Sequence, residues 1–346
     1  MQLKLLKLAG LLFGTTLLLT AQAQPSQYKF ANRFAVAGDG GWDYIAVDEA
    51  SARLFVSHAT VVQVVDEISG TLLGTIADTK GVHGIALAPE LNKGFTSNGK
   101  EDMLTVFDLK TLAVLGKVAT TGKNPDAIVY DSCSKQIFAF NGKSANATIL
   151  DAKTLQLTAT LDLPGKPEFA VVDGKGNLYV NIEDKNLLCH INTKTRTVEH
   201  SWSVAPGAEP SGLALDVAGQ RLFAVCGNKL MIVMNAKTGK VITTLPIGER
   251  VDGVAFDPVL KRAYSSNGDG TLTVVQEETP DTFTVLENVP TQKGARTVVV
   301  DSRTHHIFLP TATLGATPEP TANTPRPRPT LKPGSFVILD VAPVPQ

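Results

Sequence analysis

Charged and polar side chains recur at one step of a repeating pattern, and their types are those that bind metal ions or charged ligands. His83, Asp126, Glu168, Asp252 and Arg296 each directly precede a short apolar run. Imidazole and carboxylate groups are ligands for Ca²⁺, Zn²⁺ or Cu²⁺, and a guanidinium group binds carboxylates through paired hydrogen bonds. Chemistry at these residues requires a fold that brings equivalent steps of the repeat to one place.

An aromatic residue in the second strand of each repeat marks the period. The spacings between successive markers are 40, 43, 41, 44, 41 and 44 residues. A period near 42 built from short alternating strands predicts a β-propeller with one four-stranded blade per repeat. We therefore expect an all-β, seven-bladed propeller that forms a single domain over residues 24–346. The markers are Phe55, Phe95, Phe138, Tyr179, Phe223, Tyr264 and Phe308.

Strand polarity predicts which residues meet at the axis. The inner strands are expected at residues 44–47, 84–88, 127–130, 169–172, 212–215, 253–256 and 297–300. In a four-stranded meander, the residues before each inner strand and those that end each second strand open on the same face, so two polar rings should surround an axial funnel. The first ring is Trp42, Asp43, His83, Asp126, Glu168, Ser211, Asp252 and Arg296, and the second is His58, Asn98, Asn141, Asn181, Cys226, Asn267 and Thr311. We expect these rings to bind a ligand.

The last repeat lacks an outer strand, and the N-terminal segment supplies one. Residues 28–36 alternate like an outer strand, and pairing them with residues 336–339 closes the ring without an open edge. The same repeat contains a proline-rich insertion at residues 311–335. Because proline donates no backbone hydrogen bond, we expect an extended or polyproline-like loop there. It is either a tolerated surface insertion or a lid or docking arm over the loop-rich face.

The N-terminus indicates export. Lys4 and Lys7 precede an apolar run, and residues 21–23 offer a small-residue cleavage site, so residues 1–23 are predicted to be a signal peptide. No cysteine follows this site, so no lipid anchor is expected, and the mature chain has 30 Lys and Arg against 33 Asp and Glu, a net charge of −3. With only three cysteines, blade stacking rather than disulfides must hold the fold. We expect a monomer in the bacterial periplasm or at the cell exterior, without a membrane anchor.

Several segments carry a family resemblance. Leu54-Phe-Val-Ser-His58, Leu178-Tyr-Val-Asn181 and Ala263-Tyr-Ser-Ser-Asn267 resemble the Tyr-Val-Thr-Asn repeat of the YVTN β-propellers, which include the YncE-like proteins. The similarity spans the mature chain, and the motif is degenerate in every blade. The resemblance implies an exported seven-bladed propeller of the binding or surface type. Some members carry a DNA-binding label.

These residues are consistent with three alternative functions. The first is a binding module for a small ligand or a partner protein in the funnel, which the sequence favours over an enzyme. The second is a metal-dependent hydrolase or lyase, similar to seven-bladed lactonases, with one divalent ion held by some of His58, His83, Asp126, Glu168 and Asp252. The third is nucleic-acid binding, which the acidic balance of the rings disfavours. The pair His305 and His306 is expected in an exposed turn on the opposite face.

Overall fold

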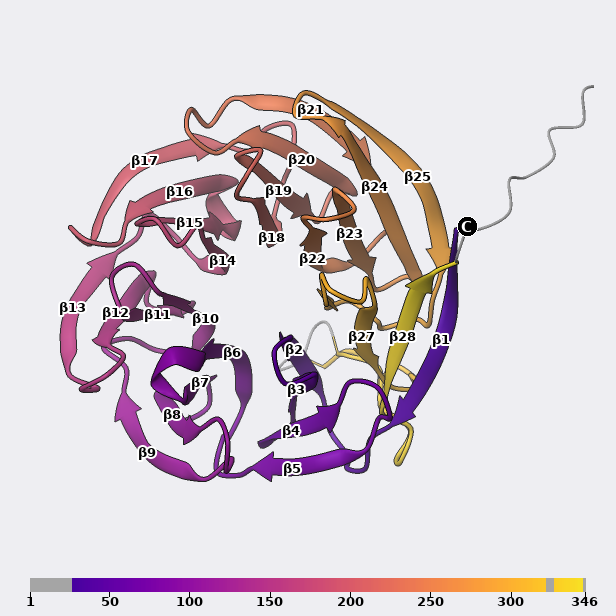
Figure 1. Cartoon of the computed structure of the whole chain (residues 1–346), viewed down its shortest axis with the longest axis horizontal. Coiled ribbons are helices and arrows are strands. Elements are labelled where there is room, and N and C mark those ends of the chain that lie inside the picture. Colours follow the sequence, from indigo (N-terminus) through magenta and orange to yellow (C-terminus); the bar gives the residue numbers. More distant parts are fainter. Residues whose placement is uncertain (1–26, 322–326, 345–346) are drawn as a thin grey trace, which may run out of the picture.

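The chain folds into a ring of β-sheets around one axis. The computed structural model describes residues 27–321 and 327–344. Over these residues, seven antiparallel sheets of four strands each stand side by side as blades (Figure 1). The predicted seven-bladed propeller is confirmed. The signal peptide expected at residues 1–23 and the expected start of the mature chain at residue 24 lie outside the described residues.

Each blade runs from an inner strand at the axis to an outer strand at the circumference. Blade 1 contains β2 (Trp42–Asp48), β3 (Arg53–His58), β4 (Val61–Asp66) and β5 (Leu72–Ile76). Blade 2 contains β6 (Val82–Ala88), β7 (Lys93–Asn98), β8 (Met103–Asp108) and β9 (Val114–Ala119). Blade 3 contains β10 (Pro125–Asp131), β11 (Gln136–Asn141), β12 (Asn146–Asp151) and β13 (Leu157–Asp162). Blade 4 contains β14 (Pro167–Val172), β15 (Asn177–Ile182), β16 (Leu187–Asn192) and β17 (Thr197–Ser203).

The remaining blades follow the same order. Blade 5 contains β18 (Pro210–Asp216), β19 (Arg221–Cys226), β20 (Leu230–Asn235) and β21 (Val241–Pro246). Blade 6 contains β22 (Val251–Asp257), β23 (Arg262–Asn267), β24 (Thr271–Thr279) and β25 (Thr282–Pro290). Blade 7 contains β26 (Val299–Val300), β27 (Ile307–Thr311), β28 (Val337–Pro343) and β1 (Tyr28–Ala35). Two single 3₁₀ turns, η1 (Pro89–Leu91) and η2 (Glu183–Lys185), are the described helical elements, and none of the described helices reaches the length and hydropathy of a membrane span.

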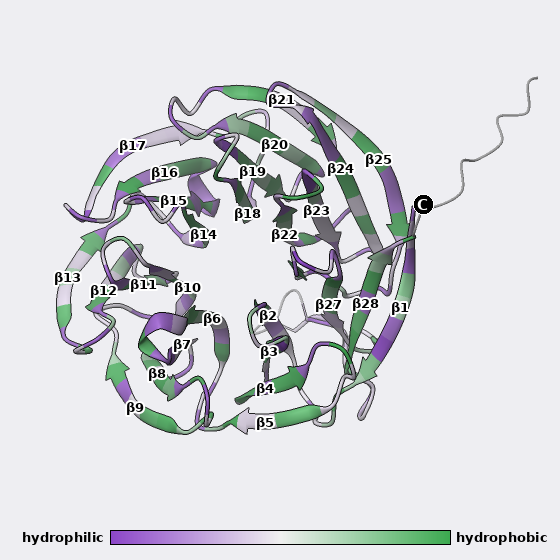
Figure 2. Cartoon of the chain, in the orientation of Figure 1, coloured by the Kyte–Doolittle hydropathy of each residue, from purple (hydrophilic) through white to green (hydrophobic). Residues whose placement is uncertain are grey.

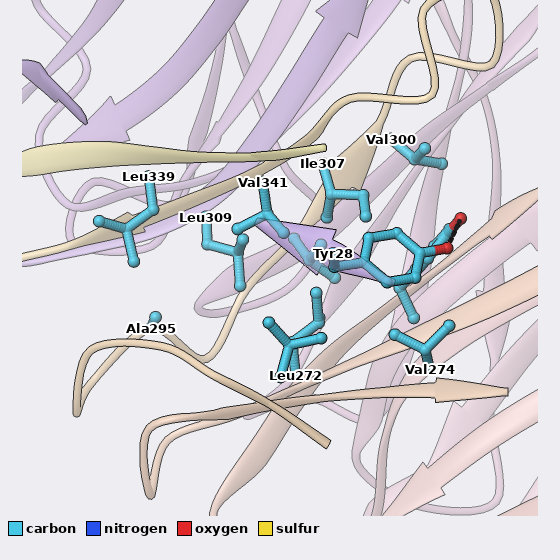
Figure 3. Close-up of a cluster of buried hydrophobic side chains, with 12 residues drawn as sticks. Tyr28, Leu272, Val274, Ala295, Val300, Ile307, Leu309, Leu339 and Val341 are labelled. Atoms are coloured by element: carbon cyan, nitrogen blue, oxygen red, sulfur yellow. Dashed lines mark hydrogen bonds between the residues drawn. The ribbon is translucent and has the colours of Figure 1, made fainter. Parts of the chain in front are cut away.

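Blade 7 is closed by the N-terminal strand, as expected. β1 pairs with β28 from Tyr28 opposite Pro343 to Ala35 opposite Val337 (Figure 1). Tyr28 is buried between blades 6 and 7, and its hydroxyl lies 3.1 Å from that of Tyr264 (Figure 3). The two ends of the chain therefore complete one sheet and seal the ring.

The core consists of apolar layers between neighbouring blades. Apolar residues run along the strands of every blade (Figure 2), and the buried clusters join residues of adjacent sheets. The seven marker aromatics are all buried there. In one of these layers, Phe223 stacks on Phe256 of the next blade with ring centroids 5.1 Å apart. The sequence period follows from this packing, because each blade presents one large side chain to an interface.

Asp and Asn at the strand ends cap hairpin turns. Asp131 accepts backbone N–H groups of Cys133 and Ser134 after an inner strand. Asp66 does the same for Ile68 and Ser69 after a third strand. These carboxylates satisfy turn donors that would otherwise need water. All three cysteines are free, so no disulfide joins the blades.

The proline-rich segment is more ordered at its base than expected. Leu314 and Leu331 form an isolated antiparallel bridge, and Gly315 N donates to Thr330 O at 2.7 Å. Both leucines pack against the core between blades 7 and 1. The expectation of a segment without ladder bonds is wrong at this base, because the two arms pair with each other.

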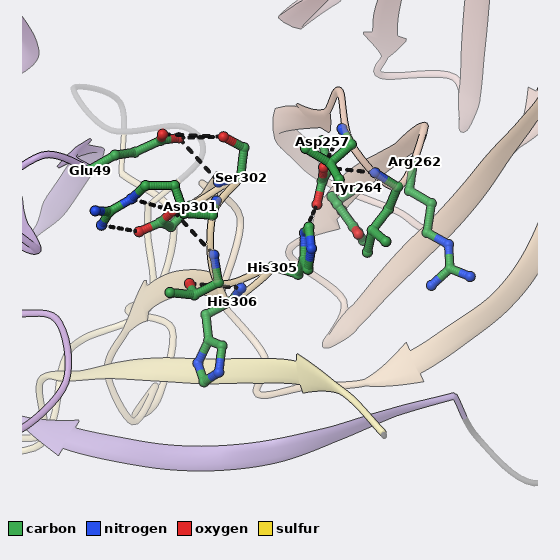
Figure 4. Close-up of polar contacts among 12 residues, drawn as sticks. Glu49, Asp257, Arg262, Tyr264, Asp301, Ser302, His305 and His306 are labelled. Atoms are coloured by element: carbon green, nitrogen blue, oxygen red, sulfur yellow. Dashed lines mark hydrogen bonds and ion pairs between the residues drawn. The ribbon is translucent and has the colours of Figure 1, made fainter. Parts of the chain in front are cut away.

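His305 and His306 are half-buried rather than exposed. Nδ1 of His305 lies 2.7 Å from Oδ2 of Asp257 (Figure 4), and Nδ1 of His306 lies 2.7 Å from Oδ1 of Asp340. Beside them, Ser302 donates to Glu49 of blade 1. The first hairpin of blade 7 therefore ties together three sheets by hydrogen bonds across blade boundaries.

Two carboxyl groups meet at the boundary between blades 1 and 7. Glu67 is buried, and its carboxyl shares a hydrogen bond with Asp301. Oε2 of Glu67 has no hydrogen-bond donor among the described residues. Burial, and then Asp301, raises the pKa of Glu67 from 4.5 to about 7. The native fold therefore favours the protonated carboxyl group.

We expect Glu67→Gln to stabilise the protein at pH 8 and not at pH 5. The unfolded chain ionises Glu67 near pH 4.5, so its contribution to stability is lost as pH rises from about 4.5 to about 7. The neutral amide avoids this loss, and the gain at pH 8 should be about 1–3 kcal/mol. Denaturant unfolding at both pH values measures it. The control is Glu278→Gln, which changes an exposed carboxylate of β24; an equal gain at pH 5 and pH 8 would contradict the assignment.

Candidate functional site

The first polar ring is positioned by a distortion of the inner strands. In blades 1–6 the pairing of the inner strand with the second strand shifts register directly after its first residue. Such bulges bend a strand and redirect a side chain. The residues at these bulges are Asp43, His83, Asp126, Glu168, Ser211 and Asp252, and Arg296 lies in the unpaired segment before β26.

Polar residues of the second strands fix these bulges. Ser57 Oγ donates to Tyr44 O at 3.0 Å, Ser266 Oγ donates to Ala295 O at 2.9 Å, and Ser97 Oγ donates to Asp126 O. Asn181 occupies the same strand position in blade 4 and donates to the carbonyls of Ser211 and Gly212. Backbone groups freed by the bulge are thereby satisfied. Asn181 supports the ring of the next blade instead of lining the funnel.

The second predicted ring does not line the funnel, which corrects the sequence prediction. In blades 2, 3 and 6 the end residue of the second strand bonds to the third residue of the third strand: Nδ2 of Asn98 to Thr105, of Asn141 to Thr148 and of Asn267 to Thr273, at 2.8 to 3.0 Å. All six of these side chains are buried. Successive residues of a strand face opposite sides of the sheet. Because the position before them, as in Ser97 and Asn181, bonds to the next blade, these end residues face the preceding blade.

His58 and Cys226 are also buried away from the funnel. Nδ1 of His58 lies 2.7 Å from Oε1 of Gln63, and its ring stacks on Phe336 at 4.0 Å. Cys226 is fully buried, and burial raises the pKa of its thiol to about 12. His58 is therefore removed from the predicted metal ligands, and Asp43 takes its place beside His83 and Asp126.

The funnel is an open cavity of about 1120 Å³ on the loop-rich face. Its lining includes every residue of the first predicted ring. Tyr44 of blade 1 and Phe169 of blade 4 stack across the axis with ring centroids 5.0 Å apart. Because both rings also line the cavity, they form an aromatic floor, and the funnel is a pocket on one face.

Arg296 and His83 are held by the carboxylates of the ring. Arg296 Nε donates to Asp252 at 2.7 Å, its Nη2 donates to Trp42 O at 3.0 Å, and its guanidinium lies 5.6 Å from the centre of the Trp42 indole. Nδ1 of His83 lies 2.6 Å from Asp43 and 3.9 Å from Asp126. Burial alone lowers the pKa of His83, but the Asp43 hydrogen bond and the Asp126 charge raise it above its ordinary value.

Asp126 and Glu168 are carboxyl groups that resist ionisation. Their side chains are 18% and 15% exposed. Burial, outweighing the nearby His83, raises the pKa of Asp126 to about 6. Burial and the Asp126 charge raise the pKa of Glu168 to about 8, although Lys166 Nζ lies 2.5 Å away. Strongly shifted carboxyl groups in a cavity mark candidate functional residues.

A basic rim surrounds the mouth of the funnel and was not part of the sequence prediction. These residues lie in loops outside the two predicted rings, so equivalence between repeats did not select them. Arg328 belongs to the proline-rich segment and still reaches the funnel. The lining as a whole has six acidic and six Lys or Arg residues. The rim residues are Lys100, Lys123, Lys143, Lys166 and Arg328.

Comparisons with known proteins support the fold. No protein-family model matches the chain. A stretch of 107 residues, 31% of this chain, is 25% identical to Protein 6 of Northern cereal mosaic virus and covers 78% of it. Hydrazine synthase of Kuenenia stuttgartiensis has a TM-score of 0.67 with 16% identity, over 79% of this chain and 94% of that chain. The WD40 repeats of RRP9 give a TM-score of 0.73 with 8% identity, over 91% and 97%. At these identities the likeness shows the propeller fold alone.

We expect Asp43→Asn to lower the pKa of His83, because a charged hydrogen-bond partner is lost. The titration of the imidazole Cε1–H signal by NMR measures this, with His83→Ala identifying the signal. Asp39→Asn, which changes an exposed carboxylate before β2, is the matched control. An unchanged His83 pKa in Asp43→Asn would show that the short contact does not hold the charged imidazole.

Proposed function

We propose that the protein is a binding module that holds a small polar ligand in its axial funnel. One observation carries this proposal: ring residues of all seven blades line one open cavity of about 1120 Å³. Ligand sites are typically concave, with a few convergent polar groups on an apolar base. One fold supports many functions, so this cavity, and not the propeller itself, indicates what the protein does.

The chemistry of the lining supports a ligand more than a water-filled channel. The stack of Tyr44 on Phe169 gives the cavity an apolar floor, and Asp126 accepts no side-chain hydrogen bond from the described residues. A buried carboxyl group without donors is costly. A ligand that donates hydrogen bonds to Asp126 would remove this cost when it binds.

The cellular setting forms part of the same proposal. The predicted signal peptide and the resemblance to YVTN propellers favour an exported monomer in the bacterial periplasm or at the cell exterior. A partner protein that inserts a loop into the funnel would use the same side chains as a small molecule. Nucleic acid is disfavoured, since six acidic residues balance the six basic residues of the lining and a polyanion site needs a cationic excess.

We expect His83→Ala and Glu168→Gln to abolish ligand binding with little effect on the stability of the ligand-free protein. Glu168 has a pKa of about 8, so glutamine closely replaces its protonated form at pH 7. A thermal-shift screen of small polar metabolites should give compounds that raise the Tm of the wild-type protein by several degrees, as binding of ligand at about 100 times Kd contributes about 2.7 kcal/mol.

Neither funnel variant should respond to those compounds, whereas Glu278→Gln should respond like the wild-type protein. If every stabilising compound acts equally on the funnel variants, the ligand site lies elsewhere on the molecule.

A metal-dependent hydrolase or lyase is the second candidate, and one observation favours it. Ligand atoms of Asp43, His83 and Asp126 all lie within 4.8 Å of one another. One imidazole and two carboxylates suit a divalent ion such as Zn²⁺, with Ca²⁺ and Cu²⁺ as the alternatives. A bound ion would supply Lewis-acid chemistry, and it would require His83 to give up its Nδ1 proton.

This candidate predicts one equivalent of Zn²⁺, Ca²⁺ or Cu²⁺ per chain in elemental analysis of the purified mature protein. Asp126→Asn should lose the ion. Asp252→Asn should keep it, because Asp252 bonds to Arg296 and lies outside the group of three. Equal metal content in both variants would remove the hydrolase candidate and leave the binding module in place.

A further inference from the structure

The charges of the funnel are sorted by depth. The carboxyl groups of Asp43, Asp126 and Glu168 belong to the inner strands, and their side chains are 15% to 19% exposed. Lys100, Lys143 and Arg328 line the same cavity from loops and are exposed. Asp102 and Glu183 of the same loops pair with Lys123 and Lys166, so a molecule that enters the funnel meets Lys100, Lys143 and Arg328 before it reaches the inner-strand carboxyl groups.

The deep cations of the funnel are already engaged, which leaves the carboxyl group of Asp126 open to a ligand. Arg296 bonds to Asp252 and to Trp42 O, and His83 bonds to Asp43. Asp126 has no closer cation than Nδ1 of His83, at 3.9 Å. The ligand group that fits this position is a hydrogen-bond donor with positive charge. An ammonium group offers three such donors.

The rim, in contrast, offers positive charges that suit an anionic ligand group. Lys123 pairs with Asp102, and Lys166 pairs with Glu168 and Glu183. Lys100 and Lys143 form no ion pair within the described part of the chain. They lie on blades 2 and 3, the blades that carry His83 and Asp126. The position for an anionic group is therefore on the same side of the funnel as the open carboxyl group.

We propose that the funnel binds a short peptide in its zwitterionic form, with the terminal ammonium group at Asp126 and the terminal carboxylate at Lys100 and Lys143. This inference rests on the proposed function and specifies its ligand. The cavity volume of about 1120 Å³ exceeds that of most pockets for a single small molecule. It accommodates a few amino-acid residues, whose side chains would contact the floor formed by Tyr44 and Phe169.

The test is isothermal titration calorimetry of the mature protein, in buffer with a chelator, against trialanine, N-acetyl-trialanine and trialanine amide. We expect trialanine to bind. Acetylation, which removes the ammonium charge, should weaken binding at least tenfold, and amidation, which removes the carboxylate, should weaken it severalfold.

Variants identify which residues bind each end of the peptide. Asp126→Asn should weaken the binding of trialanine but not the binding of the acetylated peptide. Lys143→Ala should weaken the binding of trialanine but not the binding of the amide. Lys110→Ala is the control, because Lys110 is an exposed lysine in the hairpin after β8, on the opposite face. Equal affinity for the three peptides, or no binding of any of them, would overturn the inference. The proposed function would survive that result if other compounds still lose binding in His83→Ala and Glu168→Gln, and it would fall if those variants bind them normally.

Discussion

Crowding of the inner strands around the axis is the constraint on which the rest of the structure depends. A Cβ atom added at Gly84 would lie 2.8 Å from Asp126 O, and one at Gly212 would lie 2.9 Å from Asp252 O. The backbones of neighbouring blades therefore touch at these points. Each inner strand of blades 1–6 departs from regular pairing at this level, and the bulge directs one side chain per blade into the funnel. The candidate site is a direct consequence of how seven strands share one axis.

The polar residues that recur in the repeat maintain this arrangement. Ser57 and Ser97 bind the bulged backbone, Ser266 binds the backbone before β26, and pairs such as Asn98 with Thr105 join the second and third strands. These hydrogen bonds satisfy buried polar groups that would otherwise lack partners. Residues that repeat therefore serve the scaffold. The ring positions, which hold Asp, His, Glu, Ser and Arg in different blades, are free to differ and give the funnel its chemistry.

The sequence was sufficient to predict the fold and the first of the two polar rings. The aromatic period predicted the blades because one large side chain fills each interface, and the missing outer strand predicted closure by residues 28–36. The second ring was wrong because a shift of one residue along a strand reverses the side-chain direction, as the different roles of Asn181 and Asn98 show. The stack of Tyr44 on Phe169 depends on the diameter of the ring. Arg328 reaches the funnel from an insertion that has no equivalent in other blades, so the repeat carried no signal for it.

The carboxyl groups of the funnel are the part of the structure that stability does not explain. Asp126 and Glu168 remain largely desolvated, with pKa values raised to about 6 and about 8, so ionisation of either group opposes folding. Asparagine or glutamine would occupy the same space without this cost. Many other Asp and Glu side chains cap turns or pair with a basic residue, as Asp66 and Asp252 do. Asp126 lines an open cavity and has no closer cation than His83, at 3.9 Å, which is the property that a site for a cationic group requires.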